Sequence, residues 1–215
     1  MGAGKPVVEF EQPSSFEFTP ENVEKAKAHI AKYPEGKQQS AVMPLLMLAQ
    51  RQNGNWIPDA AMHVIADMLS MPYIRVFEVA SFYTMYNLSP MGKYHVQVCT
   101  TTPCWLRGSD DIVRACKDET GAAPGEMSED GTFAVTEVEC LGACVNAPML
   151  EVTCGEWDKY FEDLDYESTR ALLKKLKQKK MPEAGSQIGR QSSEPVTGPT
   201  TLENQRKAWE KKQAG

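Results

Sequence analysis

Four of the six cysteines in this sequence fall into two close pairs, and paired thiols offer the clearest chemistry in the chain. Cys99 and Cys104 form a C-x4-C motif, and Cys140 and Cys144 form a C-x3-C motif. Each pair follows a segment in which apolar and polar residues alternate, as they do in a half-buried strand. A turn at the end of a strand can bring two thiolates together on a rigid support, so each pair is a candidate metal-binding or redox corner.

Several kinds of site compete for these cysteines. Structural zinc usually takes its thiolates from C-x2-C loops, and a thioredoxin-type redox pair also needs C-x-x-C. Structural disulfides are not expected without an export signal, which the start of the sequence lacks. A two-iron cluster fits the wider loops better, while simple packing of the cysteines stays open. A Rieske centre is not favoured because it needs two histidine ligands, and none of His29, His63 and His95 lies beside Cys140 or Cys144.

Other residues near the pairs carry weaker signals. Cys116 falls on the apolar side of an expected helix and Cys154 follows an apolar strand, so both are predicted to be buried small side chains rather than ligands. His95 has the same strand parity as Cys99, so a supporting role for His95 beside the cysteines is one hypothesis. Gly142 is expected to permit close approach of the backbone within the second pair.

The rest of the sequence predicts the elements that position these corners. A capping hydroxyl before a proline at Thr19-Pro20 begins a series of helical patterns, so a helical bundle is expected at residues 19–90, after an irregular arm at residues 1–18. A mixed strand and helix pattern follows at residues 91–180. Its expected strands lie at 94–99, 132–138 and 149–152, with a pairing partner at 155–161, and its expected helices lie at 107–120 and from Asp165 or Ser168 onward. The predicted fold class is therefore α+β.

Composition and charge exclude some classes of function. The chain has 215 residues, with 23 Lys and Arg against 29 Asp and Glu, so binding of nucleic acid or anionic lipid through its net charge of −6 is not expected. The longest uncharged run, residues 38–50, is too short to span a bilayer. Residues 181–215 are rich in Gly, Pro, Ser and Gln and are predicted to form a flexible or partner-bound tail, with Trp209 as a candidate anchor.

The cysteine motifs and their surroundings resemble a known family. Residues 92–104 and 140–148, together with the aromatic segment at 80–86, are similar to the thioredoxin-like [2Fe–2S] ferredoxin subunit of respiratory complex I, called the E subunit in bacteria and flavoprotein-2 in mitochondria. The resemblance covers about residues 19–180. It implies a helical bundle followed by a thioredoxin-like domain.

The resemblance also implies a function and a set of partners. One [2Fe–2S] cluster would be held by Cys99, Cys104, Cys140 and Cys144, and would exchange single electrons with the FMN of a flavoprotein subunit. That partner would also carry a [4Fe–4S] cluster and the NADH site, next to other peripheral-arm subunits. The complex would lie on the cytoplasmic face of a bacterial inner membrane or on the mitochondrial matrix side. The alternatives are the equivalent diaphorase subunit of an NAD-linked hydrogenase or formate dehydrogenase, and a mainly structural assembly subunit.

No catalytic residues are expected on this chain itself. It has neither a G-x-G-x-x-G motif after a strand nor a plausible nucleophile and base, so NADH oxidation would occur on another subunit. The reduced cluster would gain negative charge near Glu137 and Glu139. We therefore expect a low potential, roughly the −400 mV of plant-type clusters, unless backbone N–H groups donate hydrogen bonds to the sulfurs.

Overall fold

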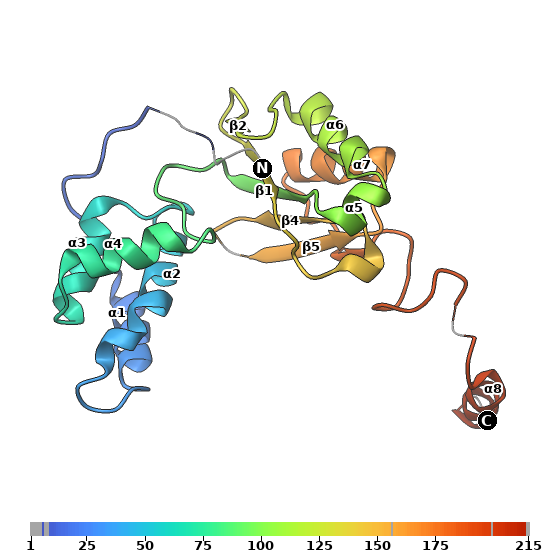
Figure 1. Ribbon diagram of the computed structural model, residues 1–215, viewed down its shortest axis with the longest axis horizontal. Coiled ribbons are helices and arrows are strands. Elements are labelled where there is room, and N and C mark those ends of the chain that lie inside the picture. The colour runs from blue at the N-terminus through green and yellow to red at the C-terminus, as the bar shows by residue number, and fades with distance from the viewer. Residues whose placement is uncertain (1–5, 7–8, 156, 199, 214–215) are drawn as a thin grey trace.

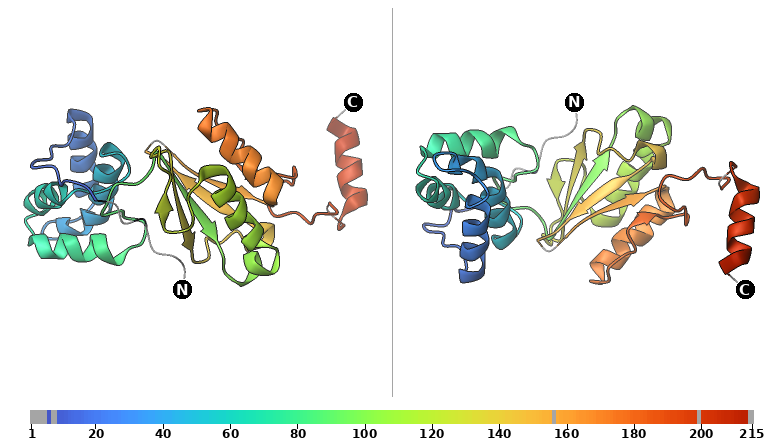
Figure 2. Two further views of the ribbon diagram at one scale, coloured as in Figure 1. Left: turned by 90° about the horizontal axis from the view of Figure 1, so that it is seen from above. Right: turned by 90° about the horizontal axis from the view of Figure 1, so that it is seen from below.

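The first part of the described chain is a group of four α-helices. The computed structural model describes residue 6 and residues 9–155, 157–198 and 200–213. The helices are α1 (Pro20–Ile30), α2 (Val42–Gln52), α3 (Asp59–Met68) and α4 (Tyr73–Phe82), with a 3-10 turn, η1 (Gln38–Ala41), before α2. They form one end of the molecule, the sheet occupies the middle, and the last helix stands at the far end (Figures 1 and 2).

Local chemistry explains where these helices begin. The Thr19 hydroxyl accepts a hydrogen bond from the backbone N–H of Asn22 at 3.3 Å, and Pro20 occupies the first helical position, as the sequence predicted. Pro44 lies in the first turn of α2, where its missing N–H leaves no helical bond unmade. The helices close over a shared apolar core that includes Leu45, Leu46 and Ile65.

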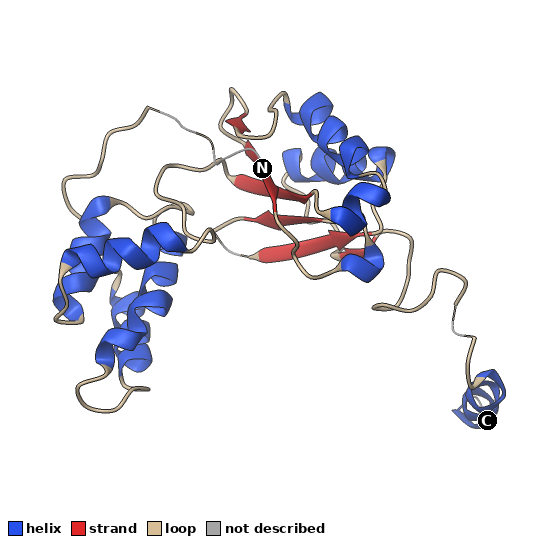
Figure 3. Cartoon of the chain, in the orientation of Figure 1, coloured by secondary structure: helices blue, strands red, loops and turns tan. Residues whose placement is uncertain are grey.

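A six-stranded sheet forms the second part of the molecule (Figure 3). Its strands are β1 (Tyr94–Cys99), β2 (Glu126–Met127), β3 (Phe133–Val138), β4 (Leu150–Thr153), β5 (Asp158–Glu162) and β6 (Gly185–Ser186), in the spatial order β2-β3-β1-β4-β5-β6. Strands β1 and β3 are parallel, whereas β4 runs antiparallel to both β1 and β5. The predicted pairing of residues 155–161 with the strand at 149–152 is therefore confirmed by the β4–β5 hairpin, with residue 156 outside the described residues.

Helices cover one face of this sheet. The helices and turns of the chain that have not yet been named are α5 (Thr102–Leu106), α6 (Ser109–Thr120), the 3-10 turn η2 (Cys144–Asn146), α7 (Tyr166–Lys177) and α8 (Glu203–Gln213). Helices α6 and α7 lie side by side (Figure 1) and bury the apolar residues of β1, β3, β4 and β5. The Asp165 carboxylate caps α7 by accepting from the Ser168 N–H at 2.7 Å, so the first of the two predicted starts is correct.

The opposite face of the sheet is polar. His95, Gln97, Thr136 and Glu151 alternate with the apolar residues that face the helices. Arg51 of α2 forms an ion pair with Asp158 of β5 at 2.6 Å, which links the helical part to the sheet. The strand β1 starts just after Gly92, where a Cβ atom would lie 2.7 Å from the backbone of Phe133, so a side chain does not fit there.

The structure confirms an α+β fold with helices at the N-terminus and differs from the sequence expectations in detail. The helix expected at 107–120 begins at Ser109, after Gly108 in a left-handed conformation (φ 95°) separates it from the short α5. The sequence predicts no element in residues 181–215, yet β6 and α8 lie there. Residues 9–18 of the expected arm contain no helix or strand, while residues 1–5, 7 and 8 lie outside the described residues. Among the described helices, none has the length and apolar content needed to cross a membrane.

Candidate iron–sulfur site

The first cysteine corner is buried at the end of β1. Cys99 is the last residue of that strand, and α5 turns back at once so that Cys104 lies against it. Pro103 favours this early helical turn. Both side chains are buried, and they share a small apolar cluster with Ala147 and Met149. The backbone N–H of Cys99 donates to the Met149 carbonyl at 3.3 Å, which fixes this corner against the chain that enters β4.

The second corner follows β3 and is more open to solvent. Cys140 is exposed, Cys144 is half-buried, and their sulfur atoms lie 3.2 Å apart. Gly142 adopts a left-handed conformation (φ 88°) between them. A Cβ atom at Gly142 would meet nothing within 4 Å, so the prediction that this glycine permits close approach of the backbone was wrong. The turn needs glycine here because the backbone is left-handed at this position.

The two corners meet because β1 and β3 are parallel neighbours. Cys99 pairs in register with Val138, so the chain leaves both strands at the same edge of the sheet. The Cys140 sulfur accepts hydrogen bonds from Cys99 and Cys144, and Cys144 lies close enough to Cys104 for its charge to act on that thiol. The four thiols that the sequence singled out are thus gathered in one place.

Burial and mutual contact divide the thiols into two kinds. Burial, followed by the hydrogen bond with Cys99, raises the pKa of Cys104 to about 12. The hydrogen bond from Cys144 lowers the pKa of Cys140, and the same contact raises the pKa of Cys144, so Cys140 is the first thiol of this more open pair to lose its proton. Metal ions bind thiolates and displace these protons, and Cys104 therefore depends most strongly on the positive charge of a metal to become ionised.

Backbone N–H groups donate to sulfur at both corners. The N–H of Gly142 lies 3.4 Å from the Cys140 sulfur, and the N–H of Met149 donates to Cys104. Such hydrogen bonds stabilise negative charge on the sulfurs and raise the potential of a cluster bound there. No local pattern in the sequence marks Met149 as part of the site, because it contributes its backbone N–H rather than its side chain. That N–H reaches Cys104 only through the tertiary fold.

Further residues close the site without offering ligands. The Tyr160 hydroxyl donates to the Leu141 carbonyl at 3.0 Å, and Arg107 reaches the Ala147 carbonyl at 3.4 Å. Burial raises the pKa of Tyr160, so its hydroxyl remains a donor at neutral pH. Within the described part of the chain, no three Cys, His, Asp or Glu side chains gather as ligands of a single ion. Two separate pairs of thiols suit two irons that each take two thiolates.

The other candidate residues lie outside this corner. His95 does share a sheet face with Cys99, but its Nε2 atom is 2.8 Å from the Thr136 hydroxyl, at the opposite end of β1. Cys116 and Cys154 are buried in the core between the sheet and its helices, as predicted. Burial alone raises the pKa of Cys116 to about 12. Because both side chains are buried in this core, they act as small packing groups.

The fold defines a thioredoxin-like protein in which four cysteines gather at one corner. Residues 26–177 match the family of thioredoxin-like [2Fe–2S] ferredoxins, and the chain belongs to that family. Membership supports one [2Fe–2S] cluster as its cofactor.

Curated relatives extend this comparison. The chain is 52% identical over 164 residues to the E subunit of the NADH-quinone oxidoreductase of Rickettsia bellii, covering 76% of this chain and 96% of that protein. The protein of the same name from Rickettsia conorii is 52% identical over 163 residues, covering 76% and 95%. Among solved structures, an NAD+-reducing [NiFe]-hydrogenase in its H2-reduced state has the same fold, with a TM-score of 0.53 and 20% identity over 65% of this chain and 23% of the hydrogenase chain.

Proposed function

We propose that Cys99, Cys104, Cys140 and Cys144 hold one [2Fe–2S] cluster, and that the chain carries electrons as a subunit of an NADH–quinone oxidoreductase. The observation that carries this proposal is the convergence of two thiol pairs at one edge of the sheet, in a chain that belongs to a [2Fe–2S] family. The 52% identity to subunits of that enzyme favours this complex over others.

Each part of the site has a definite task in this function. When bound, the cluster accepts and releases one electron at a time. The buried pair, Cys99 and Cys104, keeps water away from one side, and the N–H groups of Gly142 and Met149 stabilise charge on the sulfurs. The exposed Cys140 marks the side from which an electron enters or leaves, because tunnelling slows steeply with distance and needs a short path.

Exposed apolar side chains follow a cysteine at each of the two corners. Trp105 and Leu106 follow Cys104, Val145 follows Cys144, and the exposed fractions of their side chains are 58%, 71% and 66%. Exposed apolar groups around a site are typical of protein interfaces. We assign this surface to a flavoprotein subunit that binds FMN and NADH and holds a [4Fe–4S] cluster, within a peripheral arm on the cytoplasmic or matrix side of the membrane. Neither binding of nucleic acid nor a membrane span of this chain is part of this function.

The experiment is to isolate the complex from cells that express the full-length chain and to reduce it with NADH under EPR detection. We expect FMN and the flavoprotein to accompany the chain, and a two-iron signal to appear. Leu106→Asp should weaken association by at least roughly tenfold, because it places a charge in the docking surface. Leu202→Asp is the matched control, since Leu202 is also 71% exposed but lies in the tail. Isolation of the chain without any flavoprotein would contradict the partner assignment.

A second candidate function is a diaphorase subunit of an NAD-linked hydrogenase. Its support is the fold shared with the NAD+-reducing hydrogenase. The subunits that accompany the chain in the same preparation distinguish the two complexes. A purely structural role in assembly is tested by asking whether a folded variant without the cluster still supports NADH oxidation with an artificial acceptor.

A further inference from the structure

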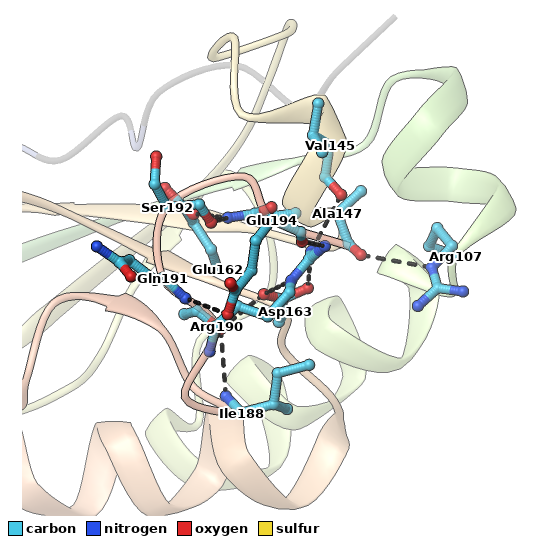
Figure 4. Close-up of polar contacts among 12 residues, drawn as sticks. Arg107, Val145, Ala147, Glu162, Asp163, Ile188, Arg190, Gln191, Ser192 and Glu194 are labelled. Atoms are coloured by element: carbon cyan, nitrogen blue, oxygen red, sulfur yellow. Dashed lines mark hydrogen bonds and ion pairs between the residues drawn. The ribbon is translucent and has the colours of Figure 1, made fainter. Parts of the chain in front are cut away.

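A segment after the family match packs against the second cysteine corner. The match ends at residue 177, and residues 183–194 return to the sheet beyond it. Gly185 and Ser186 form β6, the strand at one edge of the sheet, and pair with Phe161 and Glu162 of β5. The polar contacts of this segment converge on η2, the short turn that begins with Cys144 (Figure 4).

Arg190 is the centre of these contacts. Its guanidinium donates to both carboxylate oxygens of Asp163, one of them at 3.0 Å, and the two side chains are only 7% and 4% exposed. The hydroxyl of Ser186 donates to the same carboxylate at 2.7 Å. A buried, bidentate ion pair of this kind holds its partners in one geometry.

This ion pair is connected directly to the turn that carries Cys144. Arg190 also donates to the carbonyl of Val145 at 3.1 Å and to the carbonyl of Glu194 at 2.8 Å. The backbone N–H of Asp163 donates to the carbonyl of Asn146 at 2.7 Å. Both ends of the buried pair therefore hold the backbone immediately after Cys144 (Figure 4).

Asn146 adds a second connection. Its amide nitrogen donates to the carbonyl of Ser192 at 2.8 Å and to the carboxylate of Glu162. Flipping the amide would place its oxygen, itself an acceptor, against two other acceptor oxygens. The two partners therefore fix the orientation of the Asn146 side chain. The turn is thus tied to the segment 183–194 through a side chain as well as through carbonyl groups.

The second corner needs such support more than the first. Cys99 and Cys104 are buried between β1 and α5, whereas Cys140 is exposed and η2 has three residues. A short exposed turn opens easily when few contacts hold it. A thiolate that ligates iron must keep its position, and groups outside the ligand shell commonly supply that order.

We propose that residues 183–194 form a clamp on the second cysteine corner, in which Arg190 positions Cys144 by holding the carbonyl of Val145. The clamp deepens the proposed function, because it rests on Cys144 as a cluster ligand. The clamp fixes the conformation of the turn η2 and does not itself contact iron. The segment is therefore part of the site even though it lies beyond the residues that match the family.

The test uses full-length chain loaded with the cluster and compares Arg190→Gln, Arg190→Lys and the control Arg206→Gln. Arg206 lies in α8. Among the ion pairs found in the described residues, its side chain takes part in one, with Glu210. We expect Arg190→Gln to release iron to a chelator roughly tenfold faster than wild type and to broaden the EPR spectrum of the reduced cluster. Arg190→Lys should restore part of both properties, and Arg206→Gln should match wild type. Wild-type release and spectrum in Arg190→Gln would overturn the clamp.

A milder variant and a cluster-free measurement complete the test. Ser186→Ala removes one hydrogen bond to Asp163, and it should shift both readouts in the same direction by a smaller amount even if Arg190→Gln does not fold. In cluster-free chain, amide hydrogen exchange of residues 140–149 should be roughly tenfold faster in Arg190→Gln than in Arg206→Gln. Equal exchange would refute the clamp whether or not the wild-type chain binds iron. A wild-type chain without iron and sulfide would instead refute the proposed function.

Discussion

Cys140→Ala is expected to abolish the two-iron EPR signal of the reduced chain and to leave substoichiometric iron. The variant removes one of four proposed ligands at the corner where the two thiols lie 3.2 Å apart. Because the Cys140 side chain is exposed, the substitution opens no cavity, and the loss follows from ligation rather than from packing. Stability should also fall, since binding of a metal centre contributes to the stability of the folded state. EPR spectroscopy with iron analysis measures the first effect, and denaturant unfolding measures the second.

The control for this prediction is Cys154→Ala. Cys154 is one of the two cysteines in the core between the sheet and its helices. Its substitution should keep the full EPR signal. A full two-iron signal in Cys140→Ala, or its loss in Cys154→Ala, would show that the ligands are assigned wrongly.

Among the variants described, Phe161→Ala is expected to cause the largest loss of stability, about 3–5 kcal/mol in the free energy of unfolding. The side chain is fully buried in β5, on the face of the sheet covered by α6 and α7. Its removal leaves a cavity beside Leu150 and weakens the strand against which Gly185 pairs. Urea titration followed by circular dichroism gives the change directly.

The matched control is Phe82→Ala, because Phe82 is 77% exposed at the end of α4. Truncating an exposed side chain changes the free energy of unfolding by about 0.5 kcal/mol or less. Similar losses in the two variants would mean that the sheet is not packed around Phe161.

Much of the cysteine site was predictable because its signals are local. The alternation of apolar and polar residues from Tyr94 to Cys99 predicted strand β1, and the position of Cys99 at the end of that strand predicted the first corner. A capping pattern at Asp165 placed the start of α7. The sequence also singled out the four thiols that the fold brings together, although parity alone could not place His95, whose partner Thr136 comes from a neighbouring strand.

The parts that escaped prediction depend on contacts between distant residues. Helix α5 has five residues, too few to show a helical period, and Gly108 separates it from α6. Strand β6 has two residues and exists through its pairing with β5. Arg190 and Asp163 are 27 positions apart, and nothing in either neighbourhood marks them as a pair. Long-range pairing of short polar segments leaves no periodic pattern to detect.

The most direct test of the central claim is the iron, zinc and acid-labile sulfide content of full-length chain purified without oxygen. Four thiolates that hold a [2Fe–2S] cluster predict two irons, two sulfides and no zinc per chain, with the red-brown colour of an iron–sulfur protein. One zinc ion per chain without sulfide would contradict the account, because the cysteines would then form a structural site and the chain would carry no electron.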